Sequence, residues 1–226
     1  QLRSMGCADP LAALPDLKLL YVGGEPLPRD VADLWAPGRR LENGYGPTET
    51  TTFAATHRIR LTELAGARSV PIGRPITATR LYILNGRGQP VPAGLIGELC
   101  IGGLGVGRGY LGRPDLTAER FVPDTFAGDG SLMYRTGDLV RLNASGSVDY
   151  LGRSDGQVKI RGFRIELGEI EATLAAHPTV QACAVIARRD PDRGTELVAY
   201  VVPNAEASVS AGPAEWRTHL ADRLPE

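Results

Sequence analysis

The sequence predicts a mixed α and β protein in two parts, and three stretches of the chain support that prediction. The first stretch is a short apolar run, Leu17–Val22, followed by a predicted short helix over Pro28–Trp35. From Pro71 to Leu151 it changes to short strand-like runs separated by Gly, Asn and Pro, which is typical of a small barrel or a bent sheet. After Gln157 the pattern is basic strand, helix, strand, strand and helix. That pattern indicates a compact α+β domain of roughly 70 residues, joined near Arg153–Gln157.

The first part begins with a predicted strand and a predicted helix. Leu17–Val22 is an apolar run that ends at Gly23 and Gly24, so we expect a buried strand followed by a sharp turn. Pro28–Trp35 carries apolar residues at helical spacing and a proline at its start, where a helix needs no backbone donor. Leu41–Thr51 is too interrupted for a helix and rich in hydroxyl groups, and is predicted to be a loop.

Short strands dominate the middle of the chain, and a second helix-and-strand pattern follows. The clearest strands are Arg80–Leu84, Gly97–Ile101 and Ser147–Leu151. A short helix over Asp115–Phe121 interrupts them. In the last part, an apolar helical stripe at Leu167, Ile170 and Leu174 ends before His177. The remaining elements are expected to be strands over Val180–Ala187 and Glu196–Val202 and a helix over Glu215–Leu224.

Composition and charge exclude several classes of protein. Of the 226 residues, 25 are Lys or Arg and 26 are Asp or Glu, so the net charge of −1 argues against a nucleic-acid-binding protein. No apolar run approaches the ~18 residues of a membrane span, and the first residues lack the plan of a signal peptide. Cys7, Cys100 and Cys183 fit neither a disulfide framework nor a metal site, so we expect a reduced, cytoplasmic protein with no nucleic-acid or membrane partner. Because the chain lacks an initiator methionine, we expect it to begin inside a longer protein.

Two common nucleotide-binding motifs are excluded. Gly107–Gly112 satisfies G-x-G-x-x-G, but a dinucleotide site needs that motif directly after a strand and at the start of an ordinary helix. Arg113 and a proline follow here, so the glycines are interpreted as turn residues. No G-x-x-x-x-G-K-S/T loop occurs, and the three histidines are isolated in sequence, as expected of surface or packing residues.

The segment Tyr45–Thr51 carries groups suited to a nucleoside triphosphate. The glycines on both sides of Tyr45 are expected to leave the backbone open, so that its flat ring can stack on a base. Thr48 and Thr50 offer hydroxyls to phosphate oxygens, and Glu49 offers an oxygen ligand to Mg²⁺, which prefers one or two carboxylates together with substrate phosphates. On these residues alone, the alternative is an ordinary polar turn.

Three further segments each leave two interpretations open. Tyr134–Asp138 is predicted to be a second loop whose carboxylate could accept both hydroxyls of a ribose, although an exposed turn aspartate is favoured on these residues alone. Arg153 and Asp155 are equally consistent with a linker salt bridge and with function. Lys159–Arg164 could recognise phosphate, but a solvated basic strand is the favoured interpretation.

Four motifs, occurring in order, resemble those of a known family. They are Asn43–Glu49 (Asn-Gly-Tyr-Gly-Pro-Thr-Glu), Gly97–Gly103, Tyr134–Leu139 and Gly152–Glu171. Over nearly its whole length the chain closely resembles the adenylation domains of nonribosomal peptide synthetases, within the acyl-CoA synthetase and luciferase superfamily. The resemblance implies an α/β large-core remainder over residues 1–153, with a distorted β-barrel subdomain at about 70–152. It also implies a small, mobile α+β C-terminal domain over residues 154–226, truncated before its catalytic lysine motif.

The resemblance implies which residues contact a bound nucleotide. Tyr45 would stack on adenine, with Asn43 and Gly24 near the edge of the base. Asp138 would bind the ribose hydroxyls, with Tyr150 close by. Together with Arg153, these residues are the expected nucleotide-binding set.

The same resemblance implies the catalytic groups and the cofactors ATP and Mg²⁺. Thr48 would touch the α-phosphate, Glu49 would hold Mg²⁺, and Arg153 would assist the ribose-binding carboxylate. Asp155 matches the hinge about which the small domain swings between two half-reactions. In the first, an amino-acid carboxylate attacks ATP; in the second, the phosphopantetheine thiol of a peptidyl carrier domain takes the aminoacyl group.

The substrate is expected to be a small apolar amino acid. By position against the family's motif, the residues that line the pocket are Tyr21, Gly23, Gly44, Thr52 and Phe53. None of them offers a charge, and the glycines are expected to leave room for a branched aliphatic side chain beside an apolar wall. The combination resembles pockets that select valine. Isoleucine could also enter, because one methylene changes binding by only about 1–3 kcal/mol.

Some features of the family have no counterpart in this sequence. They are the upstream Ser/Thr/Gly-rich phosphate loop, the aspartate that pairs with the substrate's amino group, and the terminal catalytic lysine, for which Lys159 is no substitute. The chain alone is therefore expected not to catalyse adenylation. An MbtH-like helper protein is a candidate partner near Arg113–Phe126.

Two alternatives to a peptide synthetase remain. One is an acyl- or aryl-CoA ligase of the same superfamily, which would use free coenzyme A as the acceptor. The other is a non-catalytic docking remnant. The acceptor separates the first alternative from the main interpretation, and a missing lysine motif in the full-length protein would support the second.

Overall fold

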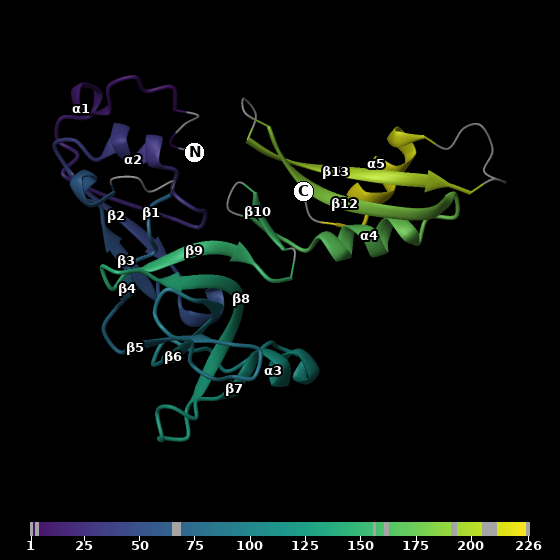
Figure 1. Ribbon diagram of the computed structural model, residues 1–226. Helices are drawn as coiled ribbons and strands as arrows, with labels where there is room; N and C mark the ends of the chain where they lie inside the picture. The colour runs from purple at the N-terminus through teal and green to yellow at the C-terminus, as the bar shows by residue number, and fades with distance from the viewer. Residues whose placement is uncertain are drawn as a thin grey trace. The chain divides into compact units, whose positions relative to one another are not determined.

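A computed structural model describes residues 2, 5–64, 69–155, 157–160, 163–190, 194–204 and 212–224 (Figure 1). The chain forms two compact units, Gln1–Asp155 and Gly156–Glu226. None of the helices in the described ranges is both long and apolar enough to cross a membrane. The three cysteines are free thiols, and burial raises the pKa of Cys100 to about 12.

The first sheet of the larger unit has the strand order β1-β2-β3-β4. Its strands are β1 (Leu19–Gly23), β2 (Arg40–Tyr45), β3 (Ala55–Arg58) and β4 (Arg74–Pro75). β1 and β2 are parallel, with α2 (Arg29–Trp35) in the connection between them, as parallel strands require. The predicted helix Pro28–Trp35 is thereby confirmed, as is the presence of a strand within Leu17–Val22. The prediction that this strand is buried is wrong, because Leu19 and Tyr21 are exposed. The other helices around this sheet are α1 (Pro10–Ala13), η1 (Thr48–Thr50) and η2 (Leu61–Leu64).

The prediction of a loop over Leu41–Thr51 is wrong for its first half. β2 is buried from Leu41 to Tyr45 and pairs with β1 on one side and β3 on the other. A central strand needs no alternating pattern, so the irregular sequence of this segment does not exclude a strand. Trp35 and Leu41 are almost fully buried in the apolar cluster under this strand.

The second sheet of the larger unit is antiparallel and has the order β5-β6-β8-β7, with β9 paired to β8. Its strands are β5 (Thr79–Leu84), β6 (Ile96–Gly103), β7 (Phe121–Pro123), β8 (Leu132–Leu142) and β9 (Val148–Arg153). The short helix α3 (Pro114–Arg120) precedes β7. The predicted middle strands and the short helix are confirmed. The sheet corresponds to the distorted barrel that the family resemblance implies, and it stays open among the described residues.

One apolar cluster joins the two sheets of the larger unit. Tyr45 and Ala55 from the first sheet pack in it with Leu99, Ile101 and Val140 from the second. The backbone also connects them, because the N–H of Val148 at the start of β9 donates to the carbonyl of Gly73 over 2.8 Å. The sheets of this unit are thus held together by a shared core.

The described residues of the smaller unit form two hairpins and two helices. Its elements are β10 (Val158–Ile160), β11 (Phe163–Ile165), α4 (Leu167–Ala175), β12 (Val180–Asp190), β13 (Gly194–Pro203) and α5 (Pro213–Ala221). This order confirms the predicted α+β pattern, except that the single basic strand expected at its start is two short paired strands, β10 and β11. In the basic segment, Arg161 lies outside the described residues, as does the side chain of Lys159.

Gly73 is the position where a side chain is expected to damage the fold most directly. Its φ is +93°, and a Cβ there would lie 1.9 Å from the carbonyl oxygen of Thr56. We predict that Gly73→Ala lowers the free energy of unfolding by more than about 2 kcal/mol, because the left-handed φ alone costs about 1–2 kcal/mol and the clash adds to it. Urea unfolding measures this change.

Gly86→Ala is the matched control, since a Cβ at Gly86 meets nothing within 4 Å. Its free energy of unfolding should stay within about 0.5 kcal/mol of the parent value. Equal stability of the Gly73 and Gly86 variants would contradict the importance of the close approach of Gly73 to the Thr56 carbonyl within the first sheet.

Candidate functional site

The predicted site residues of the first sheet lie at one edge, where β1 and β2 end. The two strands are parallel, and Gly23 pairs with Gly44 at their carboxyl ends. Gly24 and Tyr45 follow directly, so two segments distant in sequence meet here. In open α/β sheets, ligands bind outside the carboxyl ends of the strands. This edge is therefore the candidate site.

Asp138 lies within strand β8, so the prediction of a loop over Tyr134–Asp138 is wrong. Glu98 pairs with Leu139 and Cys100 pairs with Arg135, which leaves the three residues 136–138 of β8 opposite the single Leu99 of β6. Side chains replace the missing ladder bonds: the Thr136 hydroxyl donates to the Leu99 carbonyl over 2.7 Å and accepts from the Asp138 N–H over 2.9 Å. Because these residues form a bulge, their sequence looks as irregular as that of a loop although they remain in the sheet.

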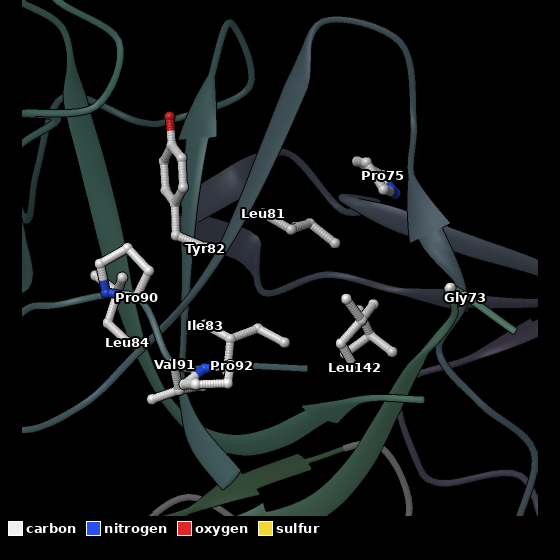
Figure 2. Close-up of a pocket in the computed structure, with 12 residues that line it drawn as sticks. Gly73, Pro75, Leu81, Tyr82, Ile83, Leu84, Pro90, Val91, Pro92 and Leu142 are labelled. Atoms are coloured by element: carbon white, nitrogen blue, oxygen red, sulfur yellow. The ribbon is translucent and has the colours of Figure 1, made fainter. Parts of the chain in front are cut away.

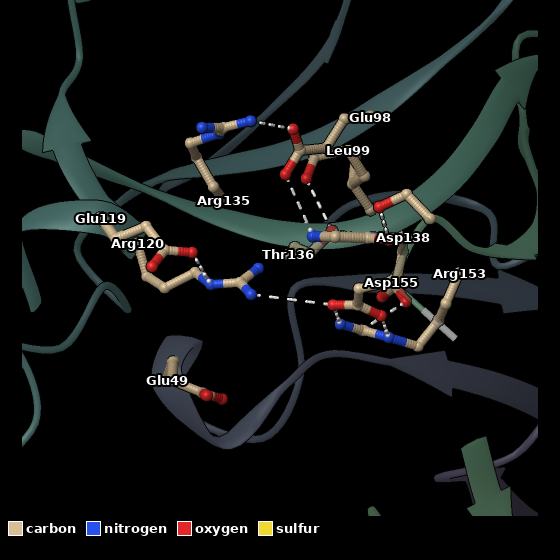
Figure 3. A network of polar contacts seen from close by, with 12 residues as sticks. Glu49, Glu98, Leu99, Glu119, Arg120, Arg135, Thr136, Asp138, Arg153 and Asp155 are labelled. Carbon is tan, nitrogen blue, oxygen red and sulfur yellow. Dashed lines mark hydrogen bonds and ion pairs between the residues drawn. The ribbon is translucent and has the colours of Figure 1, made fainter. Parts of the chain in front are cut away.

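Asp138 is buried, not an exposed turn residue. Two donors hold its carboxylate, and Figure 3 shows one of them, Arg153. Its Oδ1 accepts from Arg153 Nη1 over 2.8 Å, and its Oδ2 accepts from the Tyr45 hydroxyl. Arg153 also donates from Nε and Nη2 to both oxygens of Asp155, over 2.8 and 2.6 Å. The structure thus brings Tyr45, Asp138, Arg153 and Asp155 together in one network.

Burial and charge fix the protonation states in this network. The side chains of Arg153 and Asp138 are each only 4% exposed. Burial alone would lower the pKa of Arg153, but its hydrogen bond with Asp155 and the charge of Asp138 raise that pKa above the ordinary value. Burial, followed by the charge of Asp138, raises the pKa of Tyr45 well above its ordinary value. At neutral pH the guanidinium is therefore charged and the phenol remains a donor.

The glycines beside Tyr45 allow close packing, contrary to the expectation that they leave the backbone open. A Cβ at Gly44 would lie 2.3 Å from the ring of Phe53, so that ring rests directly on the strand. Tyr45 itself is buried, and its ring lies at a tilt to that of Tyr150, with 6.4 Å between the centroids. Only glycine gives Phe53 this approach to β2.

Glu49 lies in η1, beyond the end of β2, and is contacted by two tyrosines that the sequence analysis left without a role. Its Oε1 accepts from the hydroxyl of Tyr110 over 2.7 Å and from that of Tyr134 over 2.8 Å. Tyr110 belongs to the Gly107–Gly112 segment, whose glycines were interpreted only as turn residues. The sequence held one indication of their role: Tyr110 lies in the Gly107–Gly112 motif and Tyr134 lies in the Tyr134–Leu139 motif.

The remaining predicted nucleotide-binding residues differ in exposure. Thr48 is exposed on η1. The Thr50 hydroxyl is turned inward and donates to the Pro47 carbonyl, so it is not offered to a phosphate as predicted. Asn43 is buried, and its Nδ2 donates to the Pro71 carbonyl over 2.8 Å.

The predicted amino-acid pocket residues form one continuous set. The rings of Tyr21 and Phe53 lie 6.3 Å apart and are 48% and 37% exposed. A Cβ at Gly23 would come within 2.6 Å of the Gly44 carbonyl oxygen. Thr52 adjoins them with a φ of +70°. Two aromatic rings that remain this exposed leave an apolar surface available beside the site.

A cavity of about 280 Å³ lies elsewhere in the larger unit, on the second sheet (Figure 2). Its lining is almost entirely apolar and includes Leu81, Ile83, Val91 and Leu142. None of the predicted site residues lines it. The polar edge described above, not this cavity, therefore holds the candidate chemistry.

The arrangement can bind a polar ligand through distinct groups. One part of the site holds the buried carboxylate of Asp138 and the guanidinium of Arg153. Another part holds the carboxylate of Glu49 and the hydroxyl of the adjacent Thr48. Within the described residues, no group of three or more His, Cys, Asp and Glu side chains could hold a metal ion by itself. The donor set fits a divalent cation that takes most of its oxygens from a phosphate ligand.

Two family descriptions match most of the chain. The AMP-binding enzyme family matches residues 3–111, and the AMP-binding enzyme C-terminal domain matches residues 169–226. Novobiocin biosynthesis protein H of Streptomyces niveus is 47% identical over 214 residues, which are 95% of this chain and 35% of that protein. The dimodular nonribosomal peptide synthase of Bacillus subtilis is 49% identical over 212 residues, which are 92% of this chain and 8% of that protein.

Solved adenylation domains share the fold. The Vibrio cholerae adenylation domain AlmE, in complex with glycyl-adenosine-5'-phosphate, matches with a TM-score of 0.83 at 31% identity, over 98% of this chain and 42% of that one. Holo-PA1221, a nonribosomal peptide synthetase protein containing adenylation and PCP domains, matches with a TM-score of 0.80 at 32% identity, over 89% and 35%. The chain spans less than half of each of these four proteins. It belongs to the family of AMP-binding enzymes and, within that family, to the adenylation domains of nonribosomal peptide synthetases.

Proposed function

We propose that this chain is part of a site that joins an amino acid to AMP and then passes the aminoacyl group to a carrier domain. The observation that carries the proposal is the buried network of Tyr45, Asp138 and Arg153, which lies at the carboxyl edge of the parallel strands. The AlmE structure, whose ligand is an aminoacyl adenylate, supports it by analogy.

In the proposed complex, the nucleoside of ATP binds at the network. A carboxylate has about four lone-pair sites, so Asp138 can accept from two ribose hydroxyls in addition to Tyr45 and Arg153. Arg153 orients the carboxylate through its hydrogen bond to Oδ1. Tyr45 and Tyr150 supply the aromatic surface for adenine, with Gly24 and Asn43 nearby.

The phosphates would lie toward η1. Thr48 is exposed there and can donate its hydroxyl to the α-phosphate, and Glu49 supplies the carboxylate ligand for Mg²⁺. When bound, Mg²⁺ neutralises phosphate charge during the displacement.

The chemistry consists of two substitutions. The amino-acid carboxylate oxygen attacks the α-phosphorus, the bond to the bridging oxygen breaks, and pyrophosphate leaves. The phosphopantetheine thiolate then attacks the aminoacyl carbonyl, a thioester forms, and AMP leaves. The contribution of this chain's residues is positioning and charge stabilisation.

The proposed amino acid is valine, with isoleucine as a weaker substrate. Tyr21 and Phe53 offer apolar surface, and no charged side chain belongs to the predicted pocket set. Because the ring of Phe53 covers Gly44, the amino acid would pack against that ring instead of entering a space above the strand. This geometry favours a compact aliphatic side chain.

The proposed partners are a peptidyl carrier domain and, at the α3 region, an MbtH-like protein. PA1221 carries an adenylation domain and a PCP domain in one chain, which supports the first. Asp155, the last residue of the larger unit, is the proposed pivot for the small domain.

The proposed function is tested by amino-acid-dependent ATP–pyrophosphate exchange in the complete protein that contains this segment. Valine should give the fastest exchange, followed by isoleucine. Fastest exchange with a charged or aromatic amino acid would discard the pocket assignment and keep the enzyme class. Activity only with a simple carboxylic acid and free coenzyme A would identify an acyl- or aryl-CoA ligase, and no activity at all would favour a docking remnant.

Asp138→Asn should raise the KM for ATP about 10- to 100-fold, because a charged acceptor of hydrogen bonds contributes about 1.5–3 kcal/mol. The amide keeps an oxygen for Arg153 but loses the charge. Steady-state exchange at varied ATP concentration measures the effect.

The control is Asp149→Asn, which breaks the other Asp–Arg pair between β8 and β9, Arg141 with Asp149 at the protein surface. Its KM for ATP should not change. A folded Asp138 variant with the parent KM would remove Asp138 from the nucleotide site.

The 226-residue chain on its own should not catalyse exchange, because the sequence contains no counterpart of the family's phosphate loop or terminal lysine motif. The assay is valine-dependent exchange by the purified chain, with the complete protein as the positive control. Robust exchange by the chain alone would refute this expectation.

A further inference from the structure

The carboxylate of Glu49 is held by side chains from two distant segments. Tyr110, 61 residues further along the chain, donates to Oε1 over 2.7 Å, and Tyr134, 85 residues further along, donates to the same oxygen over 2.8 Å. The two phenol oxygens lie 3.2 Å apart. Hydrogen bonds to an ionised acceptor are the stronger class, so two on one oxygen strongly restrict the carboxylate.

The two tyrosines are themselves fixed by one aromatic ring. Phe121, at the start of β7, packs edge-on against Tyr110 with centroids 5.4 Å apart, and at a tilt against Tyr134 at 5.1 Å. It is also the register partner of Tyr134 between β7 and β8. Tyr134 is fully buried. Both phenol rings therefore pack against the same phenylalanine ring.

The loop that carries Tyr110 also holds the main chain of Glu49. The Gly107 N–H donates to the Glu49 carbonyl over 2.8 Å, and the Tyr110 N–H donates to the hydroxyl of Thr117 in α3 over 2.9 Å. The Gly107–Gly112 segment, which is not a dinucleotide motif, thus connects α3 to η1. Backbone and side chain of Glu49 are fixed by the same loop.

We infer that Tyr110 and Tyr134 are positioning residues that orient the Glu49 carboxylate for the divalent cation of bound ATP. This inference rests on the proposed role of Glu49. A free glutamate side chain must be ordered when it takes up a cation, and here the tyrosines order it beforehand. Hydrogen-bonding partners of metal ligands typically change metal affinity or activity by 10–100-fold when they are removed.

The experiment measures Mn²⁺ affinity by electron paramagnetic resonance, in the complete protein with a non-hydrolysable ATP analogue bound. The variants are Tyr110→Phe, Tyr134→Phe and Glu49→Gln. Each tyrosine variant should raise the Kd for Mn²⁺ about tenfold. The affinity for the ATP analogue measured without a divalent cation should not change, whereas a general loss of structure would weaken both.

Tyr82→Phe is the matched control. Tyr82 is a half-buried tyrosine of the same sheet whose hydroxyl donates to a different carboxylate, that of Asp124, over 3.1 Å. Its loss should leave Mn²⁺ affinity unchanged. If Tyr134→Phe does not fold because it removes a buried hydroxyl, Tyr110→Phe decides the outcome.

The results separate the inference from the proposed function. Weakened Mn²⁺ binding in Glu49→Gln with parent-like binding in Tyr110→Phe would overturn the inference and leave the role of Glu49 in place. Parent-like binding in Glu49→Gln would overturn both. Weakening in the glutamate and tyrosine variants but not in Tyr82→Phe would support the inference.

Discussion

The candidate site depends on a positive charge buried between β8 and β9. Arg153 is surrounded by protein, and a guanidinium there is tolerated only because Asp138 and Asp155 both face it. Removing one partner of such a buried pair costs about 3–5 kcal/mol, far more than a surface ion pair contributes. The same guanidinium pairs with the carboxylate that accepts from the Tyr45 hydroxyl. Arg153 thus contacts Asp155, the last residue of the larger unit, and Asp138. Through Asp138 it is also connected to Tyr45.

Two kinds of constraint place the site residues. Backbone pairing sets the coarse position: the parallel register of β1 and β2 puts Gly23 beside Gly44, and the cross-strand register puts Asp138 beside Arg153. Side chains then replace backbone bonds where the ladder is broken, as Thr136 does in the bulge. A regular β8 would have kept its N–H groups in the ladder and could not have presented the carboxylate in the same way.

The predictable and the unpredictable parts of the structure differ in the range of the interactions involved. Local patterns predicted α2, α3 and the hairpin strands, because helix starts and turns are set by neighbouring residues. The same reasoning failed for β2, because a segment that looked too interrupted for an element becomes a buried strand between two partners. The contact of Tyr110 with Glu49 joins residues 61 positions apart, and no spacing rule reveals it. The family motifs identified the candidate site residues, but they did not predict which of these side chains contact one another.

Strand β8 carries both ends of the proposed nucleotide site. Tyr134, which contacts Glu49, and Asp138, which contacts Arg153, lie four residues apart on this one strand. At about 3.3 Å per residue, the strand separates them by at most about 13 Å. The length of this strand segment therefore sets the distance between the proposed ribose site and the proposed metal-bound phosphates. A one-residue insertion or deletion in β8 would alter that length and reverse the facing of every later side chain, whereas the hairpin loops can change length freely.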